Sequence, residues 1–268
     1  MSEKDASTWV IGVGYLGSRL LAALRACGQS AWGIDVRPPA DFVGDAADVS
    51  FLNSLSKPKR VYCCQATRGG DAEAYRQSYL GVVEAVRQCC PEAEIIFCSS
   101  CSLYGGRDGA LLDESSPLSI KGERAEILQA AESAVLAAGG RVARLSALYG
   151  EGRSVLLPRF SAGVVPVCGS PQRWLNYVHV DDVVKALIML PNVPHGVYNV
   201  ATESVCKADL LQQLCALTHL PIPTQEPATS RRGSCSQRID SSRLRQLGWC
   251  PQHRLTSFLE AESRCHEG

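Results

Sequence analysis

The sequence has no surplus of either charge. Lys and Arg together number 27, Asp and Glu also number 27, and the isoelectric point is about 6.9. A balanced chain of this kind carries no basic field that would attract a nucleic acid or an anionic membrane surface. We therefore expect a small-molecule partner, with no nucleic acid and no membrane involved.

The sequence also lacks a long apolar segment. No stretch reaches the ~18 apolar residues that would span a bilayer. The opening residues, MSEKDASTWVIG, have no long apolar run before a cleavage site, so they do not read as a secretory signal. We expect a cytoplasmic protein. Its 268 residues are enough to bury a core without disulfide or metal staples.

A second C-x-x-C pair is missing. The 13 cysteines include one such pair, Cys98 and Cys101, and the five histidines are scattered along the chain. A structural zinc site usually takes two such pairs, or one pair with spaced histidines. In a cytosolic chain, cysteines within apolar runs are better read as small buried hydrophobes than as a disulfide framework. We predict no metal site; a metal or thiol redox protein is an alternative that rests on this pair alone.

A glycine-rich turn follows the first apolar run. Residues 9–11 read as a strand, and apolar residues at helical spacing follow the turn as far as Gly28. In a G-x-G-x-x-G turn the first glycine permits the tight bend, the second lets the backbone approach a pyrophosphate, and the third lets strand and helix pack closely. The helix N-terminus would then hold the phosphates. The alternative is a structural turn that binds nothing. We predict a dinucleotide-binding turn formed by Gly12, Gly14, Tyr15, Leu16 and Gly17.

Two residues at the end of the second strand-like run, residues 30–36, and just past it bear on the choice of cofactor. Asp35 stands where an acid would accept hydrogen bonds from the adenosine ribose and would repel a 2′-phosphate, which favours NAD. Arg37, just before two prolines, could receive such a phosphate or simply be solvated. We predict NAD and keep NADP as the alternative.

Strand-like and helix-like segments alternate along the chain. The strands are expected at 60–66, 93–100 and 141–150, and the helices at 71–90 and 125–138. This alternation predicts an α/β fold, a doubly wound parallel (Rossmann) sheet with helices on both faces. We expect a dinucleotide-binding domain over 1–150. The mixed region 151–268 would complete the sheet, with strands near 177 and 197 rejoining it, and would form a small C-terminal substrate-binding lobe.

Short motifs occur in an order that resembles one known family over nearly the whole chain. After the glycine turn come SYLGVVEAV, similar to an N-x-x-G-T helix with Ser78 in place of the asparagine, and CSSCSLYGG, similar to S-S-x-x-V-Y-G. Later matches are DESSPLS, RVARLSALYGEGR, RWLNYVHVDDVVKAL, GVYNVAT and RIDSSRLRQLGWCP. The chain thus resembles the extended short-chain dehydrogenase/reductases, the NAD-dependent epimerase/dehydratase group that includes nucleotide-sugar enzymes.

The resemblance implies further roles for residues of this chain. Asp48 falls where the family has an adenine-contacting acid, and Gln65 and Ala66 fall at a strand end beside the cofactor. A homodimer through the helices at 71–90 and 123–138 is also implied by the resemblance alone.

One motif of the family is absent. In the Y-x-x-x-K pair the tyrosine exchanges a proton with the substrate, and the lysine lowers the tyrosine pKa and holds the nicotinamide ribose; a free tyrosine, with a pKa of about 10, is a poor base at neutral pH. The corresponding segment, IKGERAEILQ, contains no tyrosine. Lys121 or Arg124 falls near the place of the tyrosine, and Ala125 or Leu128 near that of the lysine.

Four residues remain as candidates for catalysis. Ser100 and Ser102 follow a central strand and could hydrogen-bond a substrate oxygen, although serines at strand ends are often capping groups. Tyr104 could act as an acid or simply pack its ring. Lys121 could supply a positive charge or be a solvated cation.

The second half supplies candidate substrate ligands. The planar fork of an arginine binds two oxygens of a phosphate or carboxylate at once. We predict this role for Arg153, Arg173 and Arg232, against the alternative of a basic surface loop. His179 is expected on a half-buried strand, and the acids Asp181 and Asp182 at the start of a helix, as its N-cap.

The leading hypothesis is an atypical NAD(P)-dependent oxidoreductase or epimerase/dehydratase-like enzyme that acts on a polar, nucleotide-sugar-like small molecule. Hydride transfer at the nicotinamide would carry the chemistry, and the protein would supply orientation and a proton donor. The competing hypothesis is a cofactor-binding sensor or regulatory protein without turnover. The missing tyrosine favours the sensor, whereas the substrate-side arginines favour the enzyme.

Overall fold

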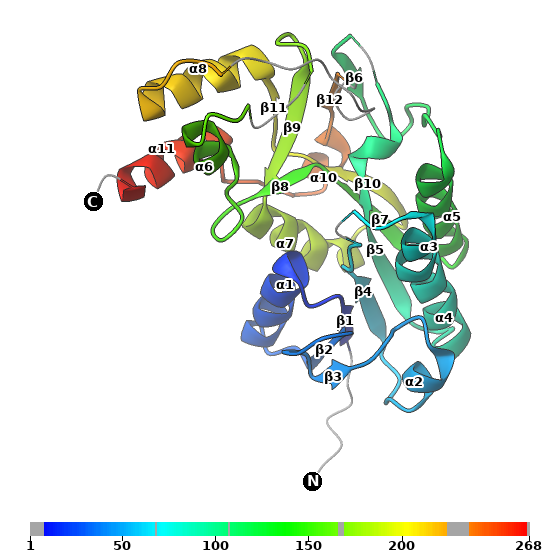
Figure 1. Ribbon diagram of the computed structural model, residues 1–268. Helices are drawn as coiled ribbons and strands as arrows, with labels where there is room; N and C mark the ends of the chain where they lie inside the picture. The colour runs from blue at the N-terminus through cyan, green and yellow to red at the C-terminus, as the bar shows by residue number, and fades with distance from the viewer. Residues whose placement is uncertain (1–7, 68, 107, 166–168, 224–235, 267–268) are drawn as a thin grey trace. The chain divides into compact units, whose positions relative to one another are not determined.

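A seven-stranded sheet forms the first half of the fold (Figure 1). The computed structural model describes residues 8–67, 69–106, 108–165, 169–223 and 236–266. The strand order is β10-β7-β5-β4-β1-β2-β3, and the pairings β1–β2, β1–β4, β2–β3 and β4–β5 are parallel. The strands are β1 (Thr8–Ile11), β2 (Ala31–Asp35), β3 (Phe42–Val43), β4 (Arg60–Cys63), β5 (Glu94–Ser100), β7 (Arg141–Leu145) and β10 (Gly196–Val200).

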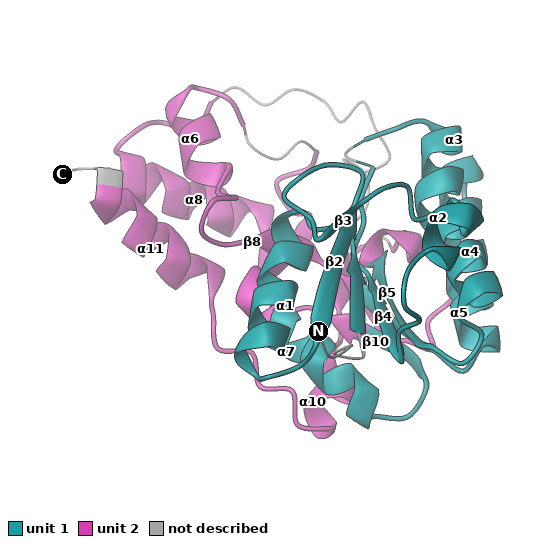
Figure 2. Cartoon of the chain, turned by 90° about the horizontal axis from the view of Figure 1, so that it is seen from below, with its two compact units in different colours: residues 1–100, 120–144, 184–198 teal, residues 101–119, 145–183, 199–268 magenta. Residues whose placement is uncertain are grey.

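Helices cover both faces of this sheet. Figure 2 shows α1 on one face and α3, α4 and α5 on the other. The helices of this part are α1 (Tyr15–Ala26), α2 (Val49–Asn53), α3 (Ala72–Tyr75), the π-helix η1 (Arg76–Gly81), α4 (Val82–Cys89), α5 (Glu123–Ala137), α7 (Val180–Met189) and the 3₁₀ turn η3 (Leu190–Asn192). The predicted doubly wound sheet is therefore confirmed. No helix within the described ranges has both the length and the apolarity to cross a bilayer.

The chain divides into two compact units that interleave along the sequence. Unit 1 comprises residues 1–100, 120–144 and 184–198, and unit 2 comprises 101–119, 145–183 and 199–268 (Figure 2). Unit 2 contains the sheet β11-β9-β8 and the pair β12–β6. Its elements are η2 (Cys101–Leu103), β6 (Ala110–Leu112), β8 (Ala147–Tyr149), α6 (Leu156–Ser161), β9 (Trp174–His179), β11 (Glu203–Cys206), α8 (Lys207–Thr218), β12 (Gln237–Ile239), α10 (Ser242–Gln246) and α11 (Leu255–His266).

Two strand predictions were partly wrong. The segment 141–150 is two strands rather than one, because the chain turns at Ser146, whose N–H bonds to Val200, and β7 and β8 then join different sheets. Of the two later strands, β10 joins the main sheet as predicted. The strand at 177 instead pairs with β8 and β11, so its backbone groups are satisfied in the smaller sheet.

A reversal of strand order lies between β1 and β4. From β1 the chain builds outward through β2 to β3, and it then returns to place β4 on the other side of β1. The two helices that follow such strands leave on opposite faces, so a crevice opens at the carboxyl ends of β1 and β4. Any dinucleotide site of this sheet is expected there.

A buried carboxylate joins β5, α5 and β7 within unit 1. Glu132 is 2% exposed and Arg144 is 4% exposed. Arg144 donates from Nε to Oε1 at 3.1 Å and from Nη2 to Oε2 at 2.6 Å, and the Ser99 hydroxyl donates to Oε1 at 2.5 Å. This network fixes the rotation of α5 about its axis and its position along the two strands.

Removal of this charge tests the network. We expect Glu132→Gln to lower the free energy of unfolding by about 3–5 kcal/mol, because the guanidinium of Arg144 would stay buried without a counter-charge. Urea denaturation followed by tryptophan fluorescence measures the change. The control Glu126→Gln alters an exposed carboxylate of the same helix and should change stability by no more than about 0.5 kcal/mol. Equal stability of the two variants would contradict the network.

Candidate dinucleotide site

The glycine turn packs directly against the neighbouring strand end. Gly12 donates its N–H to Ile34 at 2.8 Å and has a φ of +87°, in the left-handed region that glycine tolerates. A Cβ at this position would lie 2.4 Å from the backbone nitrogen of Gln65. The turn therefore lies at the reversal between β1 and β4, and only glycine fits there.

The other two glycines of the turn have opposite surroundings. A Cβ on Gly17 would lie 1.9 Å from the carbonyl oxygen of Gly12, so this glycine lets α1 pack on the turn. A Cβ on Gly14 would meet nothing within 4 Å. Gly14 is also the N-cap of α1 and has no capping side chain. Gly14 thus leaves room for a ligand at the N-terminus of α1, the end of a helix that suits an anion.

Asp35 braces this turn from the end of β2. One carboxylate oxygen accepts the N–H of Val13 at 2.7 Å, and the other accepts the N–H of Arg37 at 3.3 Å. The Arg37 side chain is exposed, whereas the Asp35 side chain is half-buried. The carboxylate is therefore held in place before any ligand binds, and Leu16 is buried against the core behind the turn.

The residues past β4 include an unsatisfied polar atom. Gln65 donates from Nε2 to the carbonyl of Ser78 at 2.8 Å, which orients its amide. Its buried Oε1 has no hydrogen-bond partner among the described residues, and a buried acceptor left unpaired costs free energy. Ala66, the next residue, is exposed. A ligand with a donor group would complete this site, so the crevice fits a bound dinucleotide.

Asp48 has a structural role in the chain. It is the N-cap of α2 and accepts the N–H of Ser50 at 2.8 Å. An N-cap of this kind stabilises a helix by about 1 kcal/mol. Capping of α2 explains the presence of an aspartate at position 48 without an adenine contact.

The four candidate catalytic residues have different environments. Ser100 ends β5 and is half-buried, Ser102 is exposed in η2, and Lys121 is exposed just before α5. Tyr104 is 2% exposed, and its hydroxyl donates to Asn199 Oδ1 at 2.8 Å, within a cluster that also contains Cys101. Because that hydroxyl is buried and engaged, Tyr104 fits a packing role, the alternative recognised from sequence.

The predicted substrate arginines are only partly described. Arg153 is exposed in the turn before α6, and Arg173 is half-buried before β9. Arg232 lies outside the described residues. Arg238, from the same stretch of sequence, donates from Nε to the carbonyl of Gly109 at 2.8 Å and lies over the Trp174 ring, so it supports the β12–β6 pair.

The C-x-x-C pair does not act as a pair. The thiol of Cys98 lies 3.7 Å from that of Cys64, on the neighbouring strand, whereas Cys101 accepts the hydroxyl of Ser146 at 3.7 Å. Every described cysteine is a free thiol. The neighbouring thiol and burial hold the pKa of Cys64 well above its usual value, so it stays protonated at neutral pH.

Comparison with known proteins agrees with this geometry. The family model described as "NAD dependent epimerase/dehydratase family" matches residues 9–201, from β1 to just past β10. The chain belongs to that family. Its match covers the glycine turn, the α5 segment and the first strands of unit 2.

Relatives and solved structures give the same result for the fold. Protein YeeZ of Escherichia coli K12 is 28% identical over 219 residues, which cover 73% of this chain and 77% of that protein. The UDP-glucose 4-epimerase of Thermus thermophilus, solved with NAD, has a TM-score of 0.78 at 20% identity, covering 97% of this chain and 99% of that one. The dTDP-glucose 4,6-dehydratase of Bacillus anthracis, also solved with NAD, has a TM-score of 0.80 at 15% identity, covering 98% and 97%.

The inward face of α5 describes the surroundings of the residues near the family's Y-x-x-x-K sites, among them Arg124 and Leu128. The helix turns Ile127, Leu128, Ala131, Glu132 and Val135 inward. Leu128 lies one turn before Glu132 on the same face, and Arg124 lies one turn earlier still. Arg124 and Leu128 are therefore the i, i+4 pair that continues this face toward the helix start. Leu128 is buried and apolar, so it offers nothing to hold a ribose.

Tyr79 is a candidate that the sequence did not single out. It lies in the π-helical segment η1, and π-bulges within helices are frequent at functional sites. Its ring lies 5.0 Å from that of Tyr75, and Arg124 lies over the Tyr75 ring. Burial and the neighbouring Tyr75 raise the pKa of Tyr79, although hydrogen bonds to Thr67, past the end of β4, lower it. In the sequence, Tyr79 directly follows Ser78, the residue that stands in place of the asparagine of the family's N-x-x-G-T helix. That position was the signal available.

The contrast between Gly14 and Gly17 is testable in the isolated protein. We expect Gly17→Ala to lower the free energy of unfolding by at least about 1–3 kcal/mol, because the new methyl group overlaps the Gly12 carbonyl. Gly14→Ala should cost no more than about 1 kcal/mol, the usual effect of alanine at an N-cap. Urea denaturation of both variants measures the difference. Similar costs at the two positions would mean that the turn is packed differently.

Proposed function

We propose that this chain binds NAD at the glycine turn and catalyses oxidoreduction of the epimerase/dehydratase type on a polar, nucleotide-linked small molecule. The observation that carries the proposal is the open space at Gly14, which is the N-cap of α1 and lies at the reversal of strand order. A negatively charged pyrophosphate suits that position because the helix N-terminus is its positive end.

The comparisons support the class of ligand. Structures similar to this chain were solved with UDP-glucose and NAD, with TM-scores of 0.77 to 0.78. We carry the nicotinamide cofactor and a nucleotide-sugar substrate over to this chain as part of the proposal. A homodimer stays a prediction from the family resemblance.

The residues have distinct roles in the proposed site. NAD, when bound, supplies the hydride acceptor and donor. The N–H groups beside Gly14 hold the pyrophosphate, Asp35 receives the adenosine ribose hydroxyls and disfavours a 2′-phosphate, and the free Oε1 of Gln65 accepts a donor from the cofactor. Ser100, at the end of β5, hydrogen-bonds a substrate oxygen.

The proton donor is the main departure from the family. Because the segment at the family's Y-x-x-x-K sites contains no tyrosine, we assign proton transfer to Tyr79. Burial keeps Tyr79 protonated at neutral pH, and the tyrosine lies in the π-helical segment η1; we therefore propose it as the donor to a substrate carbonyl as hydride arrives. Lys121 is the second candidate for this step.

A binding protein without turnover is the alternative function. The observation that favours it is the missing tyrosine in the segment IKGERAEILQ, in which Leu128, one of the two residues near the place of the lysine, is buried. Such a protein would bind NAD and a nucleotide ligand and would report their presence through a change in its own conformation or contacts. The two functions differ in whether the protein converts a substrate, so a measurement of turnover distinguishes them.

Cofactor binding is the first test. Calorimetry with NAD, NADH, NADP and NADPH should give one site per chain and a preference for the unphosphorylated pair. Gly14→Val should weaken that binding at least tenfold with little loss of stability, because its side chain enters the open space. Ser18→Ala, on the exposed side of the same helix, is the matched control and should leave affinity unchanged. Unchanged affinity in Gly14→Val would remove this pocket from the proposal.

The same preparation is then screened with UDP- and dTDP-linked sugars. Nicotinamide absorbance follows net oxidation or reduction, and NMR of the sugar follows epimerisation, which returns the cofactor to its starting state. Cofactor binding without conversion of any sugar would select the sensor function.

The role of Tyr79 has its own test once a substrate is found. Tyr79→Phe should lower kcat by at least about 100-fold, the usual contribution of a general acid, and leave NAD affinity unchanged. Tyr75→Phe is the control, because it keeps the contact between the rings of residues 75 and 79 and removes only the hydroxyl of residue 75. The wild-type rate of carbonyl reduction should be constant between about pH 7 and 9, because only the protonated phenol donates, and should fall at higher pH. An unimpaired Tyr79→Phe would move the assignment to Lys121.

A further inference from the structure

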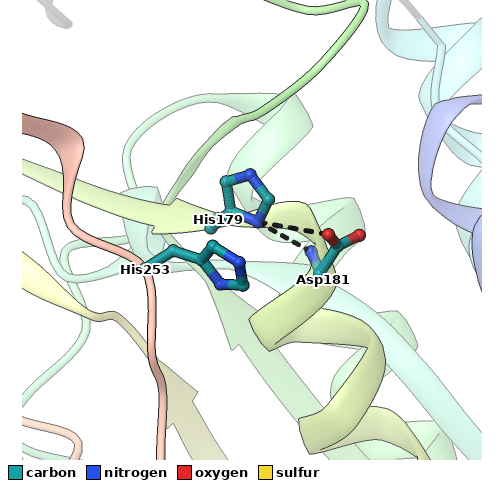
Figure 3. A group of neighbouring side chains, drawn as sticks. All are labelled: His179, Asp181 and His253. Carbon is teal, nitrogen blue, oxygen red and sulfur yellow. Dashed lines mark hydrogen bonds and ion pairs between the residues drawn. The ribbon is translucent and has the colours of Figure 1, made fainter. Parts of the chain in front are cut away.

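We propose that His179, Asp181 and His253, in unit 2, form a site for a transition-metal ion such as Zn²⁺ (Figure 3). One ligand atom from each residue lies within 4.8 Å of those of the other two. The proposal goes beyond the function inferred above and does not depend on it. No motif in the sequence indicates this site, because the two histidines are 74 positions apart.

Three segments bring these residues together. His179 ends β9, Asp181 follows in the first turn of α7, and His253 lies in the coil before α11. The fully buried carboxylate of Asp182 accepts the N–H groups of Gln252 and His253, each at 3.0 Å. Asp182 therefore caps the distant coil and holds it against the start of α7.

His179 is a rigid ligand. Its side chain is buried, and the rings of Tyr149 and Phe258 lie 5.1 Å and 6.0 Å from its own. Its Nδ1 faces Asp181, as Figure 3 shows, at 3.7 Å from Oδ2 and 3.2 Å from the backbone nitrogen. That N–H belongs to the first turn of a helix, where such groups commonly bond to solvent. An ion at Nδ1 would displace this long hydrogen bond.

His253 contributes a ring with a buried nitrogen, Nδ1, that makes no hydrogen bond among the described residues. Its ring stacks on that of His179 at 4.0 Å, with 18° between the planes. The buried Nδ1 has no partner of hydrogen-bond geometry among the described residues, although Asp182 Oδ1 lies 3.1 Å away. A buried nitrogen without a partner costs free energy, and a metal ion would satisfy it. The second carboxylate also adds negative charge beside the ion.

An ion requires the His253 ring to rotate out of its stack on His179, because an imidazole binds a metal in the plane of its ring. Zinc–ligand distances of 2.0–2.1 Å in a tetrahedral site place neighbouring ligand atoms about 3.3 Å apart. The present separations of 3.7 Å and up to 4.8 Å must therefore shorten by about 1.5 Å at most. His253 is 39% exposed in a coil and Asp181 is 54% exposed, so both side chains can turn toward the fixed His179.

The donor set selects the kind of metal. Two imidazole nitrogens with one carboxylate favour Zn²⁺, Co²⁺ or Ni²⁺ over Ca²⁺ and Mg²⁺, which prefer oxygen ligands. Three protein ligands leave a fourth position for water, because the site is open on the side of the exposed residues. A bound ion would tie the end of β9, the start of α7 and the coil before α11 together, and so would stabilise unit 2.

Cobalt is the probe because it reports its ligands. Co²⁺ titrated into the full-length reduced protein should bind at one site per chain and give the visible absorption of a nitrogen- and oxygen-ligated ion, which Zn²⁺ then removes. His253→Gln and Asp181→Asn should each weaken binding at least tenfold. Zn²⁺ should raise the melting temperature of the wild-type protein and not that of the variants. His195→Gln, at an exposed histidine before β10, should behave as the wild type.

Several results would overturn the site. The cysteines are the main competitors for these ions, and their binding would add a thiolate-to-cobalt charge-transfer band that disappears after alkylation. Such a band as the only signal, or Co²⁺ affinity unchanged in His253→Gln, would refute the proposal. Circular dichroism of each variant verifies folding, and NAD titration of the same variants keeps this test separate from the cofactor proposal.

Discussion

The fold of unit 1 depends on the absence of a side chain at two positions of the first turn. Gly12 touches the backbone of Gln65, and Gly17 touches the carbonyl of Gly12, so β1, β4 and α1 meet at distances that no Cβ would allow. This contact sets the reversal of strand order, and with it the crevice at the carboxyl ends of the strands. Gly14, between them, is the one glycine of the turn whose missing side chain leaves open space. Packing thus accounts for two of the glycines, whereas nothing packs against the third.

A second constraint holds α5 on the face of the sheet that lies opposite α1. The Glu132–Arg144–Ser99 network keeps α5 in one rotation and register, whatever residues occupy its first turns. The helix can therefore keep its position although its first turns contain no Y-x-x-x-K motif. Glu132 fixes the position of α5, whereas the residues near the start of the helix fall at the family's catalytic motif. The position of the helix therefore does not depend on the catalytic residues. The π-helical turn beside it places Tyr79 among groups that a regular helix would present differently.

Much of the fold could be predicted because its signals are local. The glycine turn, the alternation of strands and helices and the order of motifs were all confirmed, and they follow from residue spacing within short segments. The errors arose where one apolar run serves two sheets: β7 and β8 read as a single strand because nothing between them marks a turn except Ser146. The same limit applied to β9, since its partner strands are chosen by long-range pairing and not by its own composition.

The sequence by itself determined the fold class, the place of the cofactor turn, the family and the absence of the Y-x-x-x-K motif. Each of these is written in residue identities at fixed spacing. Only the tertiary structure decided which side chains are already engaged and which distant ones meet. In that structure Tyr104 hydrogen-bonds to Asn199, Asp48 caps a helix, and the ring of His179 stacks on that of His253. Such encounters depend on how the chain returns upon itself, and the free energy that selects them is shared among many contacts far apart in sequence.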